Sequence, residues 1–257
     1  MASTKKNPIS TTSKRRPWLI MAVVIAAVAA LLAAIVTMRP TAEERLAEKT
    51  DFSQFDGLAV EFIDSDEATE DGVIVFSADG GANDGAGVVN IAEDPYCSHC
   101  ADMNEVAGDA LVSKVKSGDL VARLHLAAIT DGMDNDRGPS HTANAAIASA
   151  ARAGDAAAAW GTLEMVYRNG DKTLPMSLGE YKGVMEAAGA TDATLEMISD
   201  EDARFEDAKT MWAGSGEYMQ EHAGKIATPV IFDGSNKKIE SFDITKDDWV
   251  YAVSAAS

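Results

Sequence analysis

The sequence predicts an α/β fold with an inserted block of helices, preceded by a single N-terminal transmembrane helix. Three observations lead to this prediction. Two cysteines separated by two residues, Cys97 and Cys100, lie where a strand pattern gives way to a helix pattern. Strand patterns also flank a long stretch of helical periodicity, about residues 139–224. Near the N-terminus, Trp18 to Met38 is a run of 21 residues without a charged side chain.

The N-terminal region is predicted to anchor the chain in a membrane. Residues 1–17 contain five basic residues and no acidic one, and the run of residues 18–38 would be about 31 Å long as a helix, enough to cross a bilayer core. The basic flank places the N-terminus in the cytoplasm and the rest of the chain outside it. A cleaved signal peptide is the alternative, but its apolar region is usually about 7–15 residues long, and T-M-R-P is a poor cleavage site. We therefore expect an uncleaved signal anchor.

The remainder of the chain is strongly acidic. Apart from the six basic residues up to Arg39, it carries 16 lysines and arginines against 41 acidic residues, a formal charge of −25. This charge argues against nucleic acid as a partner, because phosphate binding needs basic patches. Residues 39–72 are interpreted as an acidic juxtamembrane tether with a short helix after Thr41, and the folded domain is expected over residues 73–257.

The first elements of the domain are predicted to be two strands, a helix and a third strand. V-I-V-F at 73–76 and V-V-N-I-A at 88–92 are typical of buried strands and are separated by a glycine-rich turn. Apolar residues at helical spacing follow the cysteines as far as Gly118, and residues 120–128 alternate as a strand. Cys97 is therefore expected to open a helix, where unpaired N–H groups and the helix dipole favour a thiolate.

The second half begins with the helical block and then returns to a strand pattern. Capping residues mark helix starts within the block: Asp155, Ser177 with Glu180, and Thr191 or Ser199. The strand pattern resumes at 226–232, and a D-G-S-N turn leads to a second predicted strand at 237–242. A last helix is predicted after Thr245. This order of elements favours an α/β fold with helices inserted between strands.

Redox chemistry is the favoured explanation of the cysteine pair. A structural disulfide across so short a loop would stabilise the fold by roughly 2 kcal/mol, against about 4.7 kcal/mol for a loop of one hundred residues. Structural zinc needs four ligands, and the sequence has no second C-x-x-C, while His125, His141 and His222 lie singly. A C-x-x-C pair that cycles between dithiol and disulfide is favoured, with a metal site and a structural bridge as alternatives. Outside the cytoplasm such a pair is expected to oxidise or rearrange disulfides.

Together these motifs resemble the DsbA-like branch of the thioredoxin superfamily, in its membrane-anchored bacterial form. C-S-H-C at 97–100 is similar to the C-P-H-C of that branch, and A-T-P-V at 227–230 is similar to its cis-proline loop, which faces the cysteines. The helical block, which contains H-T-A-N-A-A near its start, resembles the inserted helical domain of the branch. The resemblance covers residues 73–257. It implies a thioredoxin-like fold with an inserted helical domain and thiol-disulfide oxidoreductase activity.

The resemblance and thiol chemistry assign roles to five residues. Cys97 is the expected attacking sulfur and Cys100 the resolving one. His99 is expected to donate a hydrogen bond to the Cys97 thiolate. Pro229 is expected to be cis and to place the Thr228 backbone beside Cys97. No organic cofactor or metal is implied, and the expected partners are thiols of exported proteins and an unidentified recycling partner, with a membrane-bound one as an option.

Three positions depart from the family pattern. Ser98 replaces the usual proline, Thr228 precedes the cis-proline as in thioredoxins and isomerases, and Ile91 occupies the position where many relatives carry a buried acid. Three polar residues are close to Ile91, but none matches, so no proton-relay residue is assigned: Asn90, Glu93 and Asp94. The choice between an oxidase and a reductase or isomerase therefore stays open.

Two further classes of function are kept as alternatives. One is a non-enzymatic extracytoplasmic binding domain that retains the fold. The other is a metal or haem chaperone, in which Cys97, His99 and Cys100 bind a soft metal. Peptide-thiol exchange by the purified protein and its metal content under reducing conditions distinguish these alternatives from the oxidoreductase.

Overall fold

The computed structural model describes residue 46 and residues 51–132, 135–169, 175–240 and 242–254. The basic segment 1–17, the predicted anchor 18–38 and nearly all of the short helix predicted after Thr41 lie outside the described residues. Within the described ranges, no helix has both the length and the apolar character needed to cross a membrane.

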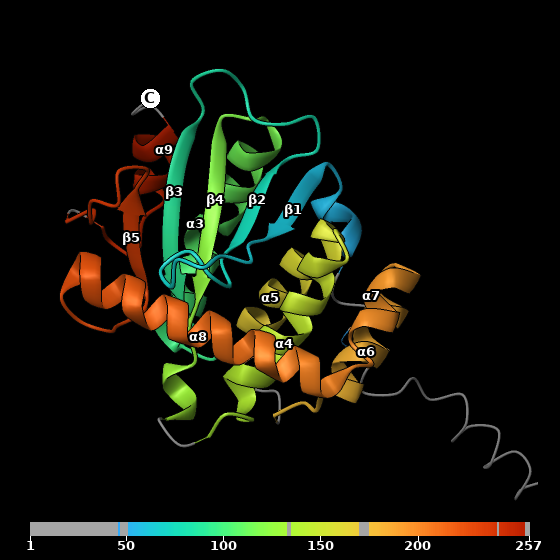
Figure 1. Cartoon of the computed structure of the whole chain (residues 1–257). Helices are drawn as coiled ribbons and strands as arrows, with labels where there is room; N and C mark the ends of the chain where they lie inside the picture. Colours follow the sequence, from blue (N-terminus) through green and yellow to red (C-terminus); the bar gives the residue numbers. More distant parts are fainter. Residues whose placement is uncertain (1–45, 47–50, 133–134, 170–174, 241, 255–257) are drawn as a thin grey trace, which may run out of the picture. The chain divides into compact units, whose positions relative to one another are not determined.

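A five-stranded mixed sheet organises the domain (Figure 1), and its strand order is β1–β2–β4–β3–β5. β3 and β4 are parallel, and the other neighbouring strands are antiparallel. The strands are β1 (Leu58–Phe62), β2 (Ile74–Ala78), β3 (Gly87–Glu93), β4 (Leu120–Leu126) and β5 (Val230–Asp233). The predicted strands at 73–76, 88–92 and 120–128 correspond to β2, β3 and β4.

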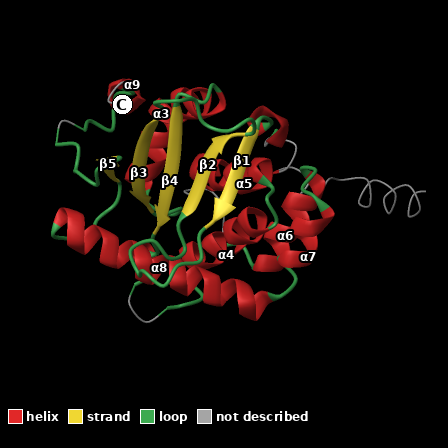
Figure 2. Ribbon diagram, turned by 45° about the horizontal axis from the view of Figure 1, so that its top comes forward, coloured by secondary structure: helices red, strands yellow, loops and turns green. Residues whose placement is uncertain are grey.

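Helices cover both faces of the sheet (Figures 1 and 2). The cysteine helix α3 (Ser98–Lys116) packs on one face, and α9 (Asp248–Ser254) lies near β3. On the other face, Ser215 of α8 (Glu201–Ala223) donates a hydrogen bond to the Leu126 carbonyl, 3.0 Å away at the end of β4. Because both faces are covered, most residues of β3 and β4 are buried, as expected for parallel strands.

Consecutive helices follow β4 in the stretch predicted as a helical block. They are α4 (Pro139–Arg152), α5 (Ala156–Asn169), α6 (Leu178–Ala187), α7 (Asp192–Met197) and α8. The Ser177–Glu180 capping box is present, and Asp155 accepts a hydrogen bond from the Ala158 N–H at 3.0 Å. Thr191 caps only the short α7, and Asp200, rather than Ser199, caps α8.

The folded domain begins earlier than the predicted boundary at residue 73. A 3₁₀ helix, η1 (Phe52–Phe55), buries its two phenylalanines, and β1 pairs with β2 along all five residues. Phe52 packs so closely against α5 that a Cβ at Gly161 would lie 2.2 Å from its ring. The tether predicted for residues 39–72 is therefore wrong over residues 51–62, since apolar side chains within this acidic stretch belong to the core.

A second difference concerns the strand predicted at 237–242. The structure forms a single bridge there, between Phe232 and Lys238, rather than a strand. β5 also starts at Val230 instead of residue 226, because the cis Thr228–Pro229 peptide bond comes directly before it.

Candidate active site

The cysteine pair lies at the junction of β3 and α3, as predicted. Cys97 is the N-cap of α3, with extended φ and ψ of −79° and 119°, and its N–H donates to the Asp94 carbonyl at 3.0 Å. Its side chain is half-buried. Cys100, one turn into α3, is fully buried in the hydrophobic core. One sulfur is thus open to a reacting partner and the other is shielded.

The loop that contains the cis-proline faces Cys97. The Thr228–Pro229 peptide bond is cis, and the Cys97 Sγ lies 3.7 Å from the Thr228 carbonyl oxygen. Both cysteines are free thiols, and their side chains lie 3.5 Å apart. Two segments separated by about 130 residues of sequence therefore meet at one sulfur atom, and the predicted proximity of Thr228 to Cys97 is present in the structure.

The two thiols have opposite acidities. The pKa of Cys97 is lowered to about 5, first by the hydrogen bond from the Cys100 thiol and then by the Thr228 side chain and the backbone N–H groups of Cys100 and His99, while partial burial opposes the shift. The pKa of Cys100 is raised well above its usual value, first by burial, then by its hydrogen bond to Cys97 and by the charge of Glu93. At neutral pH, Cys97 is therefore a thiolate and Cys100 a thiol.

His99 is exposed on the first turn of α3. Its backbone N–H is among the groups that lower the pKa of Cys97. Its imidazole makes no hydrogen bond or ion pair with any other described residue, so the predicted hydrogen bond from the side chain to Cys97 stays a prediction.

Titration of the Cys97 thiolate by its ultraviolet absorbance is expected to show a midpoint near pH 5. Cys100→Ala should raise this midpoint most, because the Cys100 thiol is the main hydrogen-bond donor to Cys97. His99→Ala tests the imidazole, because a hydrogen bond from it to Cys97 predicts a rise of at least about one unit, which corresponds to about 1.4 kcal/mol. Cys97→Ser is the control and should abolish the transition. A His99→Ala curve identical to that of the wild type would remove the imidazole from the site.

A buried acid, Glu93, lies beside the cysteines. It is two residues after the position at which the family pattern has an acid. Glu93, the last residue of β3, is only 4% exposed. Its pKa is raised to about 7, mainly by burial and also by the charges of Cys97 and Asp94, while the Tyr167 hydroxyl opposes the shift. Side chains two residues apart on a strand share a face, so Glu93 faces the same side as Ile91, one repeat closer to the cysteines. This two-residue period was the signal that could have identified it.

Asp94 anchors the catalytic turn to the helical block. Its carboxyl group is fully buried and accepts hydrogen bonds from the N–H groups of Tyr96 and Thr130, both at 2.9 Å, and from the Ser140 hydroxyl at 2.6 Å. The Thr130 hydroxyl is also within 3.1 Å. The network therefore joins the catalytic turn to η2 (Ile129–Asp131) and to the start of α4.

Asp131 extends this network to a second buried pair. It accepts hydrogen bonds from the Ser140 and His141 N–H groups at 3.0 and 2.8 Å, and its carboxyl oxygen lies 2.8 Å from His141 Nδ1. Both side chains are almost completely buried. The N-terminus of α4 is thus held against the turn that carries Cys97.

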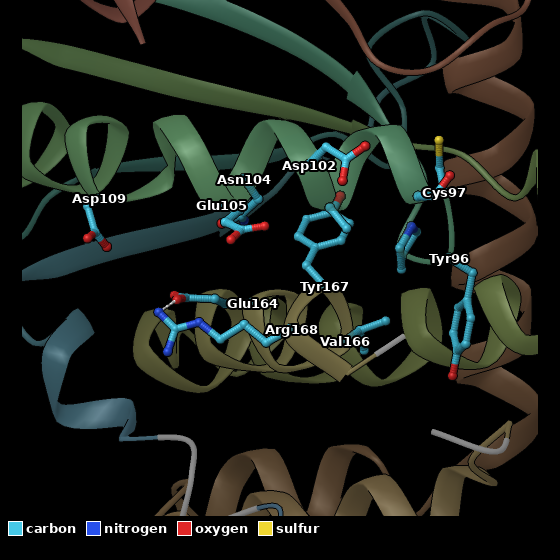
Figure 3. Close-up of a pocket in the computed structure, with 13 residues that line it drawn as sticks. Tyr96, Cys97, Asp102, Asn104, Glu105, Asp109, Glu164, Val166, Tyr167 and Arg168 are labelled. Carbon is cyan, nitrogen blue, oxygen red and sulfur yellow. Dashed lines mark ion pairs between the residues drawn. The ribbon is translucent and has the colours of Figure 1, made fainter. Parts of the chain in front are cut away.

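A groove of about 600 Å³ opens beside Cys97, between α3 and α5 (Figure 3). Pro95, Tyr96 and Cys97 lie at one end of it. Its walls carry four acidic residues and one arginine: Asp102, Glu105, Asp109, Glu164 and Arg168, of which the last two form an ion pair. The groove can therefore hold a chain segment next to the reactive sulfur. Within the described ranges, no three potential metal-ligand side chains cluster together.

Comparison with known proteins supports the fold. No protein-family model and no curated protein matches the sequence. Similar solved structures include MdbA, described as a thiol-disulfide oxidoreductase, from Corynebacterium matruchotii (TM-score 0.69, 18% identity, 82% of this chain and 98% of that one). The protein of that name from Corynebacterium diphtheriae has a TM-score of 0.65 and 22% identity, over 79% of this chain and 98% of that one. The predicted resemblance to DsbA-like proteins with a thioredoxin fold is thus confirmed at the level of the fold.

Proposed function

We propose that the chain is an extracytoplasmic thiol-disulfide oxidoreductase that forms disulfides in exported proteins through Cys97 and Cys100. The observation that carries this proposal is the opposite acidity of the two thiols, with a half-buried Cys97 whose pKa is about 5 and a buried Cys100 whose pKa is raised. A fold shared with proteins described as thiol-disulfide oxidoreductases adds support. No metal or organic cofactor takes part in the proposed reaction.

The reaction begins with the oxidised pair. A substrate thiolate attacks the Cys97 sulfur, the Cys97–Cys100 bond breaks, and Cys100 leaves with the electron pair. Because the pKa of Cys100 is high, it takes up a proton, and Glu93 is the buried acid positioned to supply one. A second substrate thiolate then attacks the substrate sulfur of the mixed disulfide and releases Cys97 as a thiolate. The substrate loses two electrons and the enzyme pair gains them.

The stabilised Cys97 thiolate favours the oxidising direction. A low thiolate pKa stabilises the reduced enzyme, and a stable reduced form makes the disulfide a strong oxidant. An oxidase then needs a partner that reoxidises it, which we propose to be membrane-bound. Reduction or isomerisation of substrate disulfides is the second candidate, favoured by Thr228 before the cis-proline. The reduction potential separates the two: about −120 mV indicates an oxidant and about −270 mV a reductant.

The position of the substrate follows from the two surfaces beside Cys97. The Thr228 backbone next to the sulfur can pair with an extended segment, and the groove between α3 and α5 can take the residues that continue from it.

We also propose that residues 18–38 anchor the enzyme in the membrane and place its catalytic domain outside the cytoplasm. The length of the apolar run and its basic flank support this topology. Protease added to cells stripped of their wall is expected to remove the catalytic domain from a protein that stays with membranes in high salt. A soluble mature protein that starts after residue 38 would instead identify a signal peptide.

Cysteine variants test the proposed reaction directly. Cys97→Ser is expected to abolish disulfide exchange. Cys100→Ala should retain attack on substrate disulfides but lose resolution, so mixed disulfides should accumulate and be visible on non-reducing gels. Ser113→Ala, an exposed change on the same helix, is the control and should trap nothing. Trapping by Cys97→Ala but not by Cys100→Ala would reverse the two roles.

A further inference from the structure

A small, partly open cavity lies next to the buried acid and reaches the C-terminal helix. It has a volume of about 20 Å³ and lies between β3, β4, α3, α5 and α9. Most of its lining is apolar, and four of its lining residues carry a polar side-chain group: Glu93, Asn104, Trp160 and Trp249. The cavity therefore brings a few polar groups together within an otherwise apolar core.

Three of these residues, Glu93, Asn104 and Trp249, suit a single bound water molecule. Trp249 is 3% exposed, and its Nε1 is buried without a hydrogen-bond partner among the described residues. Buried indole N–H groups usually have a partner. A cavity needs roughly 10–15 Å³ and two to four polar neighbours to hold a water molecule. The volume and the groups around it, including the Glu93 carboxyl, meet both conditions.

Asn104 lies at the boundary between this cavity and the groove, since it lines both. Figure 3 shows it on α3, on the side that faces α5. Its side chain folds over Gly108, where an added Cβ would lie 2.4 Å from the Asn104 Oδ1. Gly108 therefore leaves room for the Asn104 side chain at this boundary.

We propose that this cavity is a hydration site, where one water molecule bound by Trp249 and Glu93 carries protons between Glu93 and the groove past Asn104. The inference rests on the proposed function, because Glu93 must lose and regain a proton only if Cys100 does. Glu93 first gives its proton to the Cys100 thiolate, which leaves a carboxylate and a thiol. The carboxylate then takes a proton from the cavity water, which regains one from solvent in the groove, and no electrons move in this step.

Four groups face Glu93 from the elements around it: Cys97, Cys100, Asp94 and Tyr167. The pKa of Tyr167 is raised well above its usual value, first by burial and then by the charge of Glu93. Tyr167 also lines the groove, so it is the rival route for the proton. Asn104 and Trp249 are positioning residues in the proposed route, since neither touches the reacting sulfurs.

Nuclear magnetic resonance of the full-length reduced protein in detergent tests the hydration site without any activity. The indole N–H of Trp249, assigned by its loss in Trp249→Phe, is expected to show cross-relaxation with a bound water molecule. Trp212→Phe, a half-buried tryptophan on α8 outside the cavity, is the matched control and should leave that signal unchanged. An indole signal without contact to water would overturn the proposal.

Asn104→Val tests the proton route. Single-turnover release of Cys100 is expected to slow about tenfold, equivalent to roughly 1.4 kcal/mol in the barrier, with a larger solvent isotope effect and an unchanged reduction potential. Ser113→Val, at an exposed position on the same helix, is the control. The proposed route would be contradicted if the release of Cys100 were unchanged in Asn104→Val but slower in Tyr167→Phe. It would also be contradicted if the reduction potential of Asn104→Val shifted together with the rate. If the wild type exchanges no thiols while the Trp249 water is seen, the proposed function fails and the hydration site stands.

Discussion

Replacing Asp94 with alanine is expected to destabilise the reduced protein by about 4 kcal/mol or more. The change removes the acceptor for the N–H groups of Tyr96 and Thr130 and for the Ser140 hydroxyl. Each buried donor left without a partner costs roughly 1–3 kcal/mol, and a domain has only about 5–15 kcal/mol of total stability. Urea unfolding of the wild type and the variant at one pH measures the difference.

Asp51→Ala is the matched control for this loss. Asp51 is exposed, and among the described residues its carboxyl group accepts hydrogen bonds only from Ser53, whose N–H and hydroxyl lie 3.0 and 2.5 Å away. Loss of such a cap costs about 0.5–2 kcal/mol. If Asp94→Ala does not fold, Asp94→Asn keeps one carbonyl acceptor and should fall between the two. Equal losses at Asp94 and Asp51 would show that the buried network contributes nothing special to stability.

The number of residues that separates two hydrogen-bonded partners decides whether the sequence alone can predict their contact. The capping box of Ser177 and Glu180 is a local signal, and it is found where the sequence predicts it. Asp94, by contrast, is bonded to residues 36 and 46 positions away. No spacing rule reports such a contact, because only the packing of α4 against the catalytic turn creates it.

The missed strand and the missed acid have different causes. β1 lies within an acidic stretch, and its short apolar pattern became meaningful only through its pairing with β2. Glu93 does not occupy the position at which the family pattern has an acid, so the pattern alone does not identify it. Periodicity alone places it on the same face as Ile91, and this is the physical reason to regard it as a candidate.

Glu93→Gln is expected to have the opposite effect on stability from that of Asp94→Ala. The pKa of Glu93 is about 7 in the folded protein against 4.5 for an ordinary glutamate, first because of burial. The native state therefore favours the protonated acid, so its contribution is complete below pH 4.5 and is lost as pH rises through 7. A shift of this size corresponds to roughly 3 kcal/mol. Glutamine cannot ionise, so the variant should be more stable than the parent by up to about 3 kcal/mol at pH 8.

The measurement needs a background in which Cys97 does not titrate. The pKa of Cys97 is lowered to about 5, so its contribution is present above its unfolded value near 9 and is lost as pH falls through 5, which runs against the trend of Glu93. Urea unfolding at pH 4.5 and pH 8 should therefore compare Cys97→Ser with Cys97→Ser/Glu93→Gln. The two proteins should differ little at pH 4.5 and most at pH 8, by somewhat less than 3 kcal/mol because one of the charges that raises the pKa is gone.

A loss of stability in Glu93→Gln at pH 8 would contradict this expectation and would mean that the carboxylate is held by favourable contacts. The structure gives a reason for the opposite result. Asp94 and Glu93 are adjacent and both buried, but the Asp94 carboxyl accepts hydrogen bonds from three residues. Among the described residues, Tyr167 alone lowers the pKa of Glu93 through a hydrogen bond. A buried carboxyl with several donors stabilises the fold, and one with few donors destabilises it once ionised. A group that is easily protonated and deprotonated near neutral pH is the kind of acid that the release of Cys100 requires.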